Sequence, residues 1–191
     1  MLKVVVIGSE CTGKTTLARE LADWLGAPLA REYARRYVDE KRAPLDASDV
    51  EPIARGQIAA EDEAITRADE LLVLDTDLVS TVVYSRHYYG ACPSWVEDAA
   101  RARLAELYLL LHPDVPWVPD GLQRDRPYHR ERIHDEFRLT LEVLGACITQ
   151  VRGTDWDVRR AAARAAILAA MKTAGLDPRA TKPSSLLHFL S

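Results

Sequence analysis

A short segment near the N-terminus, residues 8–15, has the residue types and spacing of a phosphate-binding loop. It reads GSECTGKT and matches the pattern G-x-x-x-x-G-K-[ST]. Glycines in such a loop let the backbone turn so that its N–H groups point inward at phosphate oxygens. In this pattern Lys14 bridges the β- and γ-phosphates, and the hydroxyl of Thr15 is a ligand for magnesium.

The segments on either side of this loop are the ones that a P-loop requires. Residues 2–7 form an apolar run that predicts a buried strand, and residues 14–25 repeat apolar side chains at helical spacing and stop at Gly26. The positive end of that helix also attracts phosphate. Both conditions favour a P-loop over a simple glycine-containing turn. The residues assigned to ATP binding are Gly8, Glu10, Cys11, Thr12, Gly13, Lys14, Thr15 and Thr16.

Strand and helix signals alternate along the rest of the chain. Further strands are predicted over residues 28–30, 70–74, 107–111 and 148–151. Helices are predicted over residues 33–41, 46–68, 78–88, 94–104, 133–144 and 158–171. This order is typical of an α/β fold with a parallel sheet flanked by helices. The length of 191 residues fits one domain, residues 1–175, and a tail, residues 176–191, that either docks or is frayed.

Composition and charge limit the partners that this chain could have. The formal net charge of -4 gives no general attraction to nucleic acid or to an anionic membrane. No apolar stretch approaches the roughly 20 residues that span a bilayer. The three cysteines are scattered and form neither a disulfide framework nor a metal-binding pattern. We therefore expect a cytoplasmic protein with small-molecule partners and neither nucleic-acid nor membrane partners, and leave a homo-oligomer open.

Several classes of P-loop protein lack support in this sequence. The chain contains no asparagine, so the Asn-Lys-x-Asp element that reads guanine in switch GTPases is absent. The strand at residues 70–74 ends in Asp75-Thr76-Asp77 and not in the Asp-Glu pair of motor ATPases. No transporter-type L-S-G-G-Q signature occurs either. The class that remains is a small-molecule kinase.

A kinase needs a partner for magnesium opposite the P-loop, and two acidic residues after the second strong strand are candidates. Asp75 stands at the carboxyl end of its strand, where ligand groups gather in open α/β sheets, and we assign it to Mg²⁺ with Thr15. The alternative is an aspartate that only begins the next helix. Asp77 could contact a sugar hydroxyl or cap the helix that follows.

A kinase also needs a group that accepts the proton of the attacking hydroxyl. Glu32 follows the predicted strand at residues 28–30 and therefore lies near the same edge of the sheet. A carboxylate in that place can act as a general base. The alternative for Glu32 is a salt bridge to Arg35 or Arg36 on the next helix.

The one local basic cluster, within residues 121–132, is a candidate lid. It contains Arg126 and Arg130, which we assign to the transferring phosphate. Closing such a segment would bring positive charge over the phosphates and exclude water. The alternative is a solvated helix start whose charges are balanced by nearby acidic residues.

Five motifs in order resemble one known family. They are GSECTGKTTL from residue 8, REYAR from residue 31, ARGQ from residue 54, DTD from residue 75 and PWVPDGL from residue 116. Together they resemble the ribosylnicotinamide kinase domain of NadR-type proteins, from the first strand to about Arg160. The last motif is the most specific, because its tryptophan and aspartate are not general P-loop features. The resemblance implies a P-loop NTPase fold, nucleoside- or nucleotide-kinase-like, with a short lid.

The resemblance also implies a reaction and its site. The family uses ATP to phosphorylate the 5′-hydroxyl of nicotinamide riboside, which gives nicotinamide mononucleotide in NAD salvage. A cationic flat ring on a ribose suits a pocket of aromatic and acidic side chains. Thr154, after the last strand, is expected near adenine. The implied acceptor residues are Glu32, Tyr33, Gln57, Asp77, Trp117 and Asp120.

The sequence also departs from the family pattern. Regulatory members carry a DNA-binding and an adenylyltransferase domain that this sequence does not contain, so neither repression nor NAD synthesis is expected. Arg31 stands where members often have tryptophan, and Gln123 stands where they often have arginine. Two alternatives therefore stay open: a P-loop kinase for another nucleoside or nucleotide, and a regulator that binds ATP without turnover.

Overall fold

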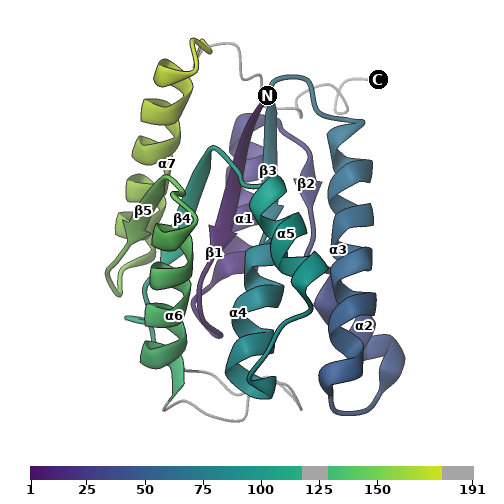
Figure 1. Ribbon diagram of the computed structural model, residues 1–191. Coiled ribbons are helices and arrows are strands. Elements are labelled where there is room, and N and C mark those ends of the chain that lie inside the picture. Colours follow the sequence, from purple (N-terminus) through teal and green to yellow (C-terminus); the bar gives the residue numbers. More distant parts are fainter. Residues whose placement is uncertain (118–128, 178–191) are drawn as a thin grey trace, which may run out of the picture.

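A five-stranded parallel sheet forms the centre of the molecule (Figure 1). The computed structural model describes residues 1–117 and 129–177. Its strands lie in the order β2-β3-β1-β4-β5, and every pairing between neighbours is parallel. This arrangement confirms the predicted α/β fold. The strands are β1 (Leu2–Ile7), β2 (Leu29–Ala30), β3 (Leu71–Asp75), β4 (Leu107–Leu111) and β5 (Ile148–Val151).

The helices follow the predicted segments closely, with differences at their ends. The helix predicted over residues 46–68 is divided into a short 3₁₀ turn and α3, because Asp46 and Asp49 form a capping box around that turn. The last helix begins two residues earlier than predicted, since the side chain of Asp155 caps it. The helical elements are α1 (Lys14–Leu25), α2 (Tyr33–Lys41), η1 (Ala47–Asp49), α3 (Val50–Ile65), α4 (Leu78–Tyr89), α5 (Ser94–Ala102), α6 (Arg130–Val143) and α7 (Trp156–Thr173).

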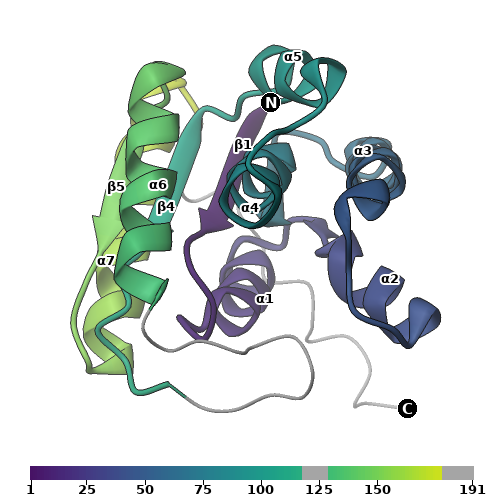
Figure 2. The same cartoon turned by 60° about the horizontal axis from the view of Figure 1, so that its bottom comes forward.

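Two apolar layers sandwich the sheet (Figure 2). On β1, Val5 and Ile7 face the layer formed with α3, α4, α5 and α6. The alternate residues Leu2, Val4 and Val6 face the layer formed with α1 and α7. The central strands β3 and β4 are buried along their whole length and are almost entirely apolar, as parallel strands usually are. No helix in the described ranges is long and apolar enough to cross a membrane.

The strand order places several loops beside one another at the carboxyl edge of the sheet. The chain leaves β1 into the P-loop, and β1 lies between β3 and β4. Strand β3 ends at Asp75 and is followed by Thr76 and Asp77. Strand β4 is followed by His112. Ligands of open α/β sheets bind where the order of strands reverses in this way. The candidate site is therefore built from the loops after β1, β2, β3, β4 and β5.

Candidate active site

The P-loop needs its two glycines for steric reasons that the structure makes specific. Gly8 has a φ of 145°, and a Cβ added there would lie 2.7 Å from the carbonyl oxygen of Leu111. Gly13 has a φ of 84°, and a Cβ there would lie 2.8 Å from the ring of Trp156. Both positions therefore exclude a side chain. Because Gly8 touches β4 and Gly13 touches α7, the loop is held against both elements.

Lys14 lies buried within the loop, close to two carboxylates. Its Nζ donates a hydrogen bond of 3.0 Å to the carbonyl oxygen of Ser9. Burial lowers the pKa of Lys14, and the nearby negative charges of Glu32 and Asp75 oppose this shift. An ammonium group in such a low-dielectric place interacts strongly with any phosphate that enters. The electrostatic coupling also brings together three of the residues assigned from the sequence.

The hydroxyl of Thr15 and the carboxylate of Asp75 lie close to each other beside Lys14. Thr15 Oγ1 and Asp75 Oδ1 are both buried, and neither has a hydrogen-bond partner of normal geometry within the described ranges. Burial and then the charge of Glu32 raise the pKa of Asp75, while Thr15 and Lys14 oppose the rise. Two unpartnered oxygens of these types are ligands that Mg²⁺ prefers. The residues therefore fit a magnesium ion that bridges to phosphate.

Such an ion would take its remaining ligands from elsewhere. Among residues 1–117 and 129–177, no three His, Cys, Asp or Glu side chains are arranged to hold a metal. Mg²⁺ in P-loop proteins commonly keeps water molecules and binds phosphate oxygens of the nucleotide. One hydroxyl and one carboxylate from the protein are thus a sufficient set of side chains for it.

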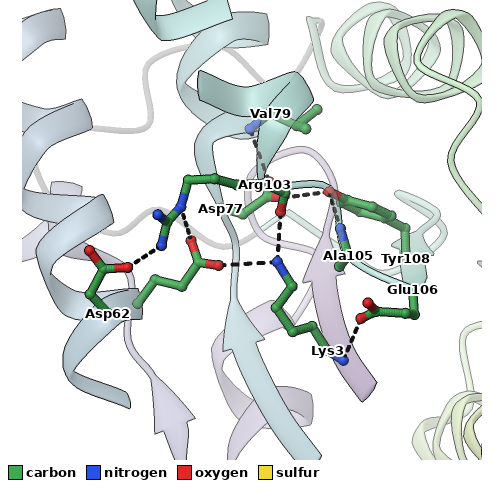
Figure 3. Close-up of polar contacts among 9 residues, drawn as sticks. Lys3, Asp62, Asp77, Val79, Arg103, Ala105, Glu106 and Tyr108 are labelled. Carbon is green, nitrogen blue, oxygen red and sulfur yellow. Dashed lines mark hydrogen bonds and ion pairs between the residues drawn. The ribbon is translucent and has the colours of Figure 1, made fainter. Parts of the chain in front are cut away.

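Asp77 lies two residues beyond Asp75 but is part of a different cluster. Thr76 between them has a positive φ of 66°, and the chain turns sharply there. Asp77 Oδ1 accepts a hydrogen bond of 3.0 Å from the N–H of Val79, and Oδ2 accepts one of 2.6 Å from the hydroxyl of Tyr108 (Figure 3). Burial raises the pKa of Asp77 to about 6. The structure supports the capping alternative for Asp77, because both of its oxygens have protein partners.

The cluster around Asp77 joins elements on one face of the sheet. Lys3 Nζ donates to the carbonyl oxygen of Arg103 at 2.8 Å and pairs with Glu61 at 3.4 Å (Figure 3). Glu61, which is buried, also pairs with Arg103 at 3.0 Å. These contacts link β1 and α3 to the segment before β4. Their role is structural, since every charged group in them has a protein partner.

Glu32 lies directly before α2, where it pairs with Arg35 and acts electrostatically on Lys14 and Asp75. Arg35 Nε donates to Glu32 Oε2 at 2.8 Å, so the predicted ion-pair alternative for Glu32 is present. The negative charge of Glu32 nevertheless acts on both Lys14 and Asp75. Arg35 acts on the same two groups and is a cation that the sequence reasoning did not assign to the site. The REYAR motif was the signal that could have identified Arg35.

The REYAR and ARGQ motifs meet through Tyr33. Gly56 on α3 lies against the Tyr33 ring, and a Cβ added at Gly56 would lie 2.1 Å from it. Gln57 Oε1 accepts a hydrogen bond of 2.9 Å from the N–H of Tyr33 and so caps α2 from outside. Gln57 Nε2 is buried and has no partner in the described ranges. This amide N–H group is therefore available to donate a hydrogen bond to a ligand that binds beside Glu32 and Tyr33.

The remaining predicted residues fall in three groups. Trp117 is half-buried and is the last residue described before the gap, while Thr154 is exposed in the loop after β5. Asp120 and Arg126 lie outside the described residues, as do most of the proposed lid and of the C-terminal tail. Arg130 is buried and donates to the carbonyl oxygens of Val115 at 3.0 Å and Cys11 at 3.4 Å. A phosphate contact by Arg130 stays a prediction.

Sequence reasoning missed one buried residue beside the P-loop. Arg159 on α7 is fully buried, and its guanidinium donates to backbone carbonyls of three loops. It occupies the same helix stripe as Ala163, Ile167 and Met171, which are all buried. An arginine at a core position of an otherwise apolar stripe was the signal that could have identified it.

Comparison with protein families gives one match over most of the chain. A family model described as an AAA domain matches residues 3–159. The trifunctional NAD biosynthesis/regulator proteins NadR of Escherichia coli (strain K12) and Salmonella typhimurium (strain LT2) are each 34% identical over 126 residues. That match covers 63% of this chain but only 30% of each relative. The chain therefore corresponds to less than a third of the curated relatives that it matches.

Solved structures with the same fold are nucleotide-binding kinases and NadR proteins. A NadR protein in complex with NR has a TM-score of 0.73 and 24% identity, over 92% of this chain and 51% of that chain. A NadR protein in complex with NAD and AMP-PNP has a TM-score of 0.69 and 25% identity, over 92% and 50%. Thymidylate kinase from Ehrlichia chaffeensis has a TM-score of 0.63 and 16% identity, over 88% and 97%. The fold is that of P-loop NTPases, and the comparisons support a P-loop kinase domain of the NadR type.

Proposed function

This chain belongs to the AAA domain family, and from that premise we propose that it is an ATP-dependent kinase for nicotinamide riboside. It would transfer the γ-phosphoryl group of ATP to the 5′-hydroxyl and form nicotinamide mononucleotide. One observation carries the proposal: Lys14, Thr15, Asp75 and Glu32 lie together at the carboxyl edge of the sheet. The NadR relatives, whose solved complexes contain NR or NAD with AMP-PNP, support the choice of acceptor.

The P-loop and Lys14 would bind the triphosphate. Backbone N–H groups of the loop and the positive end of α1 attract the phosphate oxygens. Lys14 already lies in the loop with its Nζ on Ser9 O, and it would exchange this contact for the β- and γ-phosphates. The loss of one hydrogen bond to a neutral carbonyl is small beside a buried ammonium–phosphate contact. ATP binding should therefore draw Lys14 toward the phosphates.

Thr15 and Asp75 would hold the magnesium ion that accompanies ATP. An ion held there would supply positive charge that offsets the negative charge of the phosphates during transfer. The protein's own contribution is to keep these two oxygens dry and without competing donors. Ionised Asp75 is also favoured by the neighbouring charges of Lys14 and Arg35.

Glu32 would orient the acceptor and take the proton of its 5′-hydroxyl. It lies at the start of α2, and its charge acts on both Lys14 and Asp75. We assign Tyr33, Gln57, Trp117 and Asp120 to the nicotinamide and the ribose. An aromatic ring gains a cation–π contribution from the positive nicotinamide. Arg35 would steady Glu32 and add positive charge near the transferring group.

A panel of acceptors tests the proposed reaction. Purified protein with ATP and Mg²⁺ is assayed for ADP release with nicotinamide riboside, thymidine, cytidine, adenosine and nucleoside monophosphates. We expect turnover with nicotinamide riboside above all others. Turnover with a pyrimidine nucleoside and none with nicotinamide riboside would reject the proposal in favour of another nucleoside kinase. ATP binding without turnover of any acceptor would favour a regulator.

Replacing Glu32 with glutamine should lower kcat by about a hundredfold, because the amide cannot accept the proton of the attacking hydroxyl. The affinity for ATP should change by less than about twofold, since glutamine keeps the size of the side chain. Steady-state kinetics and calorimetry with ATP measure the two effects. Glu40→Gln is the matched control, because Glu40 is exposed on α2, the helix that Glu32 precedes, and pairs with Arg36. An unchanged kcat for Glu32→Gln would remove Glu32 from the role of base.

Replacing Thr15 with valine should weaken the response to magnesium without lowering the stability of the free protein. The hydroxyl of Thr15 is buried, and its interaction with Asp75 falls short of normal hydrogen-bond geometry, so valine removes a polar group that gains little in the free protein. The Mg²⁺ concentration for half-maximal activity should rise by about tenfold. A magnesium titration at fixed ATP and a thermal melt measure these effects. Thr173→Val, at the far end of α7, is the control; equal Mg²⁺ responses in both variants would count against the assigned metal site.

A further inference from the structure

Two successive carbonyl groups of the P-loop are held from behind by buried arginines. Arg159 Nη2 donates to the carbonyl oxygen of Thr12 at 3.1 Å. Arg130 Nη2 donates to the carbonyl oxygen of Cys11 at 3.4 Å. The two side chains come from different helices, α7 and α6, and both are buried. Two guanidinium groups thus donate hydrogen bonds to carbonyl oxygens on the outer side of the loop.

Arg159 is the more strongly anchored of the two. Its Nη1 also donates to the carbonyl oxygens of His112 at 3.1 Å and Gly153 at 3.0 Å. Its Nη2 makes a second contact with His112 at 3.1 Å. One planar guanidinium therefore joins the P-loop, the segment after β4 and the loop after β5. Lysine could not reproduce this, because its single ammonium lacks the fixed fork of donors.

The direction of these carbonyls determines where the loop's N–H groups point. None of the described peptide bonds is cis. In a planar trans peptide the C=O and N–H groups point in opposite directions. Donors that draw the carbonyls of Cys11 and Thr12 outward therefore turn the N–H groups of Thr12 and Gly13 inward. In a P-loop, the inward N–H groups are those that bind phosphate.

We propose that Arg159, assisted by Arg130, is a positioning residue that aims the N–H groups of Thr12 and Gly13 at the phosphates of ATP. This inference rests on the proposed function only in requiring a nucleotide at the P-loop, and it is independent of the acceptor. Arg159 acts through the loop's backbone and touches no phosphate itself. The effect of its substitution through the P-loop should therefore grow with the number of phosphates, whereas any effect through Gly153, in the loop after β5, should be the same for ADP and adenosine.

The electrostatics of the two arginines agree with this role. Burial lowers the pKa of Arg159, and the positive charge of Arg130 lowers it further, while Asp114 opposes both. Two like charges that approach each other in a buried place favour an anion nearby. Asp114 is one such anion, and a bound phosphate would add negative charge on the inner side of the loop. The pair is thus arranged to favour a loaded loop over an empty one.

Calorimetry on Arg159→Lys tests the proposal with ADP and with adenosine, which lacks phosphate. Hydrogen bonds to charged groups are worth about 1.5–3 kcal/mol, so we expect ADP affinity to fall by about tenfold to a hundredfold. Adenosine affinity should fall much less than ADP affinity, because adenosine lacks the phosphates that the N–H groups of Thr12 and Gly13 would bind. Arg164→Lys is the matched control: Arg164 lies on the same helix, over the ring of Trp24, and is remote from the P-loop. It should bind both ligands normally.

The comparison of ligands separates positioning from damage to the fold. Circular dichroism and a thermal melt first show what fraction of Arg159→Lys is folded. Equal losses for ADP and adenosine would indicate general damage and overturn the proposal, as would unchanged binding of ADP. Failure of the unsubstituted protein to bind ADP would overturn both this inference and the proposed function. A selective loss of ADP affinity, in a protein that does not phosphorylate nicotinamide riboside, would reject only the proposed acceptor.

Discussion

Replacing Lys14 with alanine should lower the kinase turnover of this protein by about a thousandfold or more. The ammonium lies buried in the P-loop, where Glu32 and Asp75 are its charged neighbours. A point charge at the β- and γ-phosphates stabilises the charge that moves during transfer, and it does so most strongly where water is excluded. The measurement is kcat with saturating ATP and acceptor.

The same substitution should leave most of the fold intact. Lys14 makes one side-chain hydrogen bond, to Ser9 O, and α1 does not depend on it. A circular dichroism spectrum like that of the unsubstituted protein is therefore expected. Lys172→Ala, at the exposed end of α7, is the control and should keep full activity. A Lys14→Ala variant that retained more than about a tenth of the activity would contradict the P-loop mechanism.

Replacing Gly56 with alanine should displace Tyr33 and impair the acceptor site. The new methyl group would lie 2.1 Å from the Tyr33 ring, far inside van der Waals contact. Overpacking of this kind costs about 1–3 kcal/mol, although alanine in place of glycine favours the helix by about 1 kcal/mol. We expect a net loss of stability of up to about 2 kcal/mol in chemical denaturation. The KM for the acceptor should rise by about tenfold while the KM for ATP stays unchanged.

A second substitution, Tyr33→Ala, makes this prediction sharper. In that background the expected effect of Gly56→Ala on stability changes from a loss to a gain. In a Tyr33→Ala background the ring is gone, and only the helix-favouring effect of alanine at position 56 remains. Gly56→Ala should then stabilise the protein by up to about 1 kcal/mol. The double-mutant cycle isolates the Gly56–Tyr33 contact, since the two residues touch directly. Destabilisation of equal size in both backgrounds would mean that another neighbour of Gly56 is responsible.

The P-loop could be read from the sequence because everything that makes it is contiguous. The strand before it, the glycine turn and the helix after it lie within the first 25 residues. Their geometry follows from local rules of glycine conformation, strand burial and helix periodicity. Asp75 was found for a related reason, since a polar residue at the end of an apolar strand has a defined place in a parallel sheet. The fold class followed from the same alternation of strands and helices.

Asp77 shows where this kind of reasoning stops. The sequence left two roles open, and the choice depended on Thr76, whose positive φ is unusual for a β-branched residue. That turn, together with the hydroxyl of Tyr108 on β4, makes Asp77 part of a buried cluster. Neither the backbone conformation nor the partner is encoded within a few residues of Asp77.

The sequence by itself determined which residues are candidates for the phosphate end of the site: the P-loop, Lys14, Thr15 and Asp75 at the end of its strand. The tertiary structure alone decided which residues support the P-loop and which residues shape the candidate acceptor site. Arg159 reaches Thr12 across 147 positions of the chain, and Gln57 caps α2 across 24. Such contacts depend on how helices pack on the sheet, and no local pattern specifies them. The role of Arg159 follows only from the backbone carbonyls that it contacts, and the role of Gly56 follows only from the Tyr33 ring beside it.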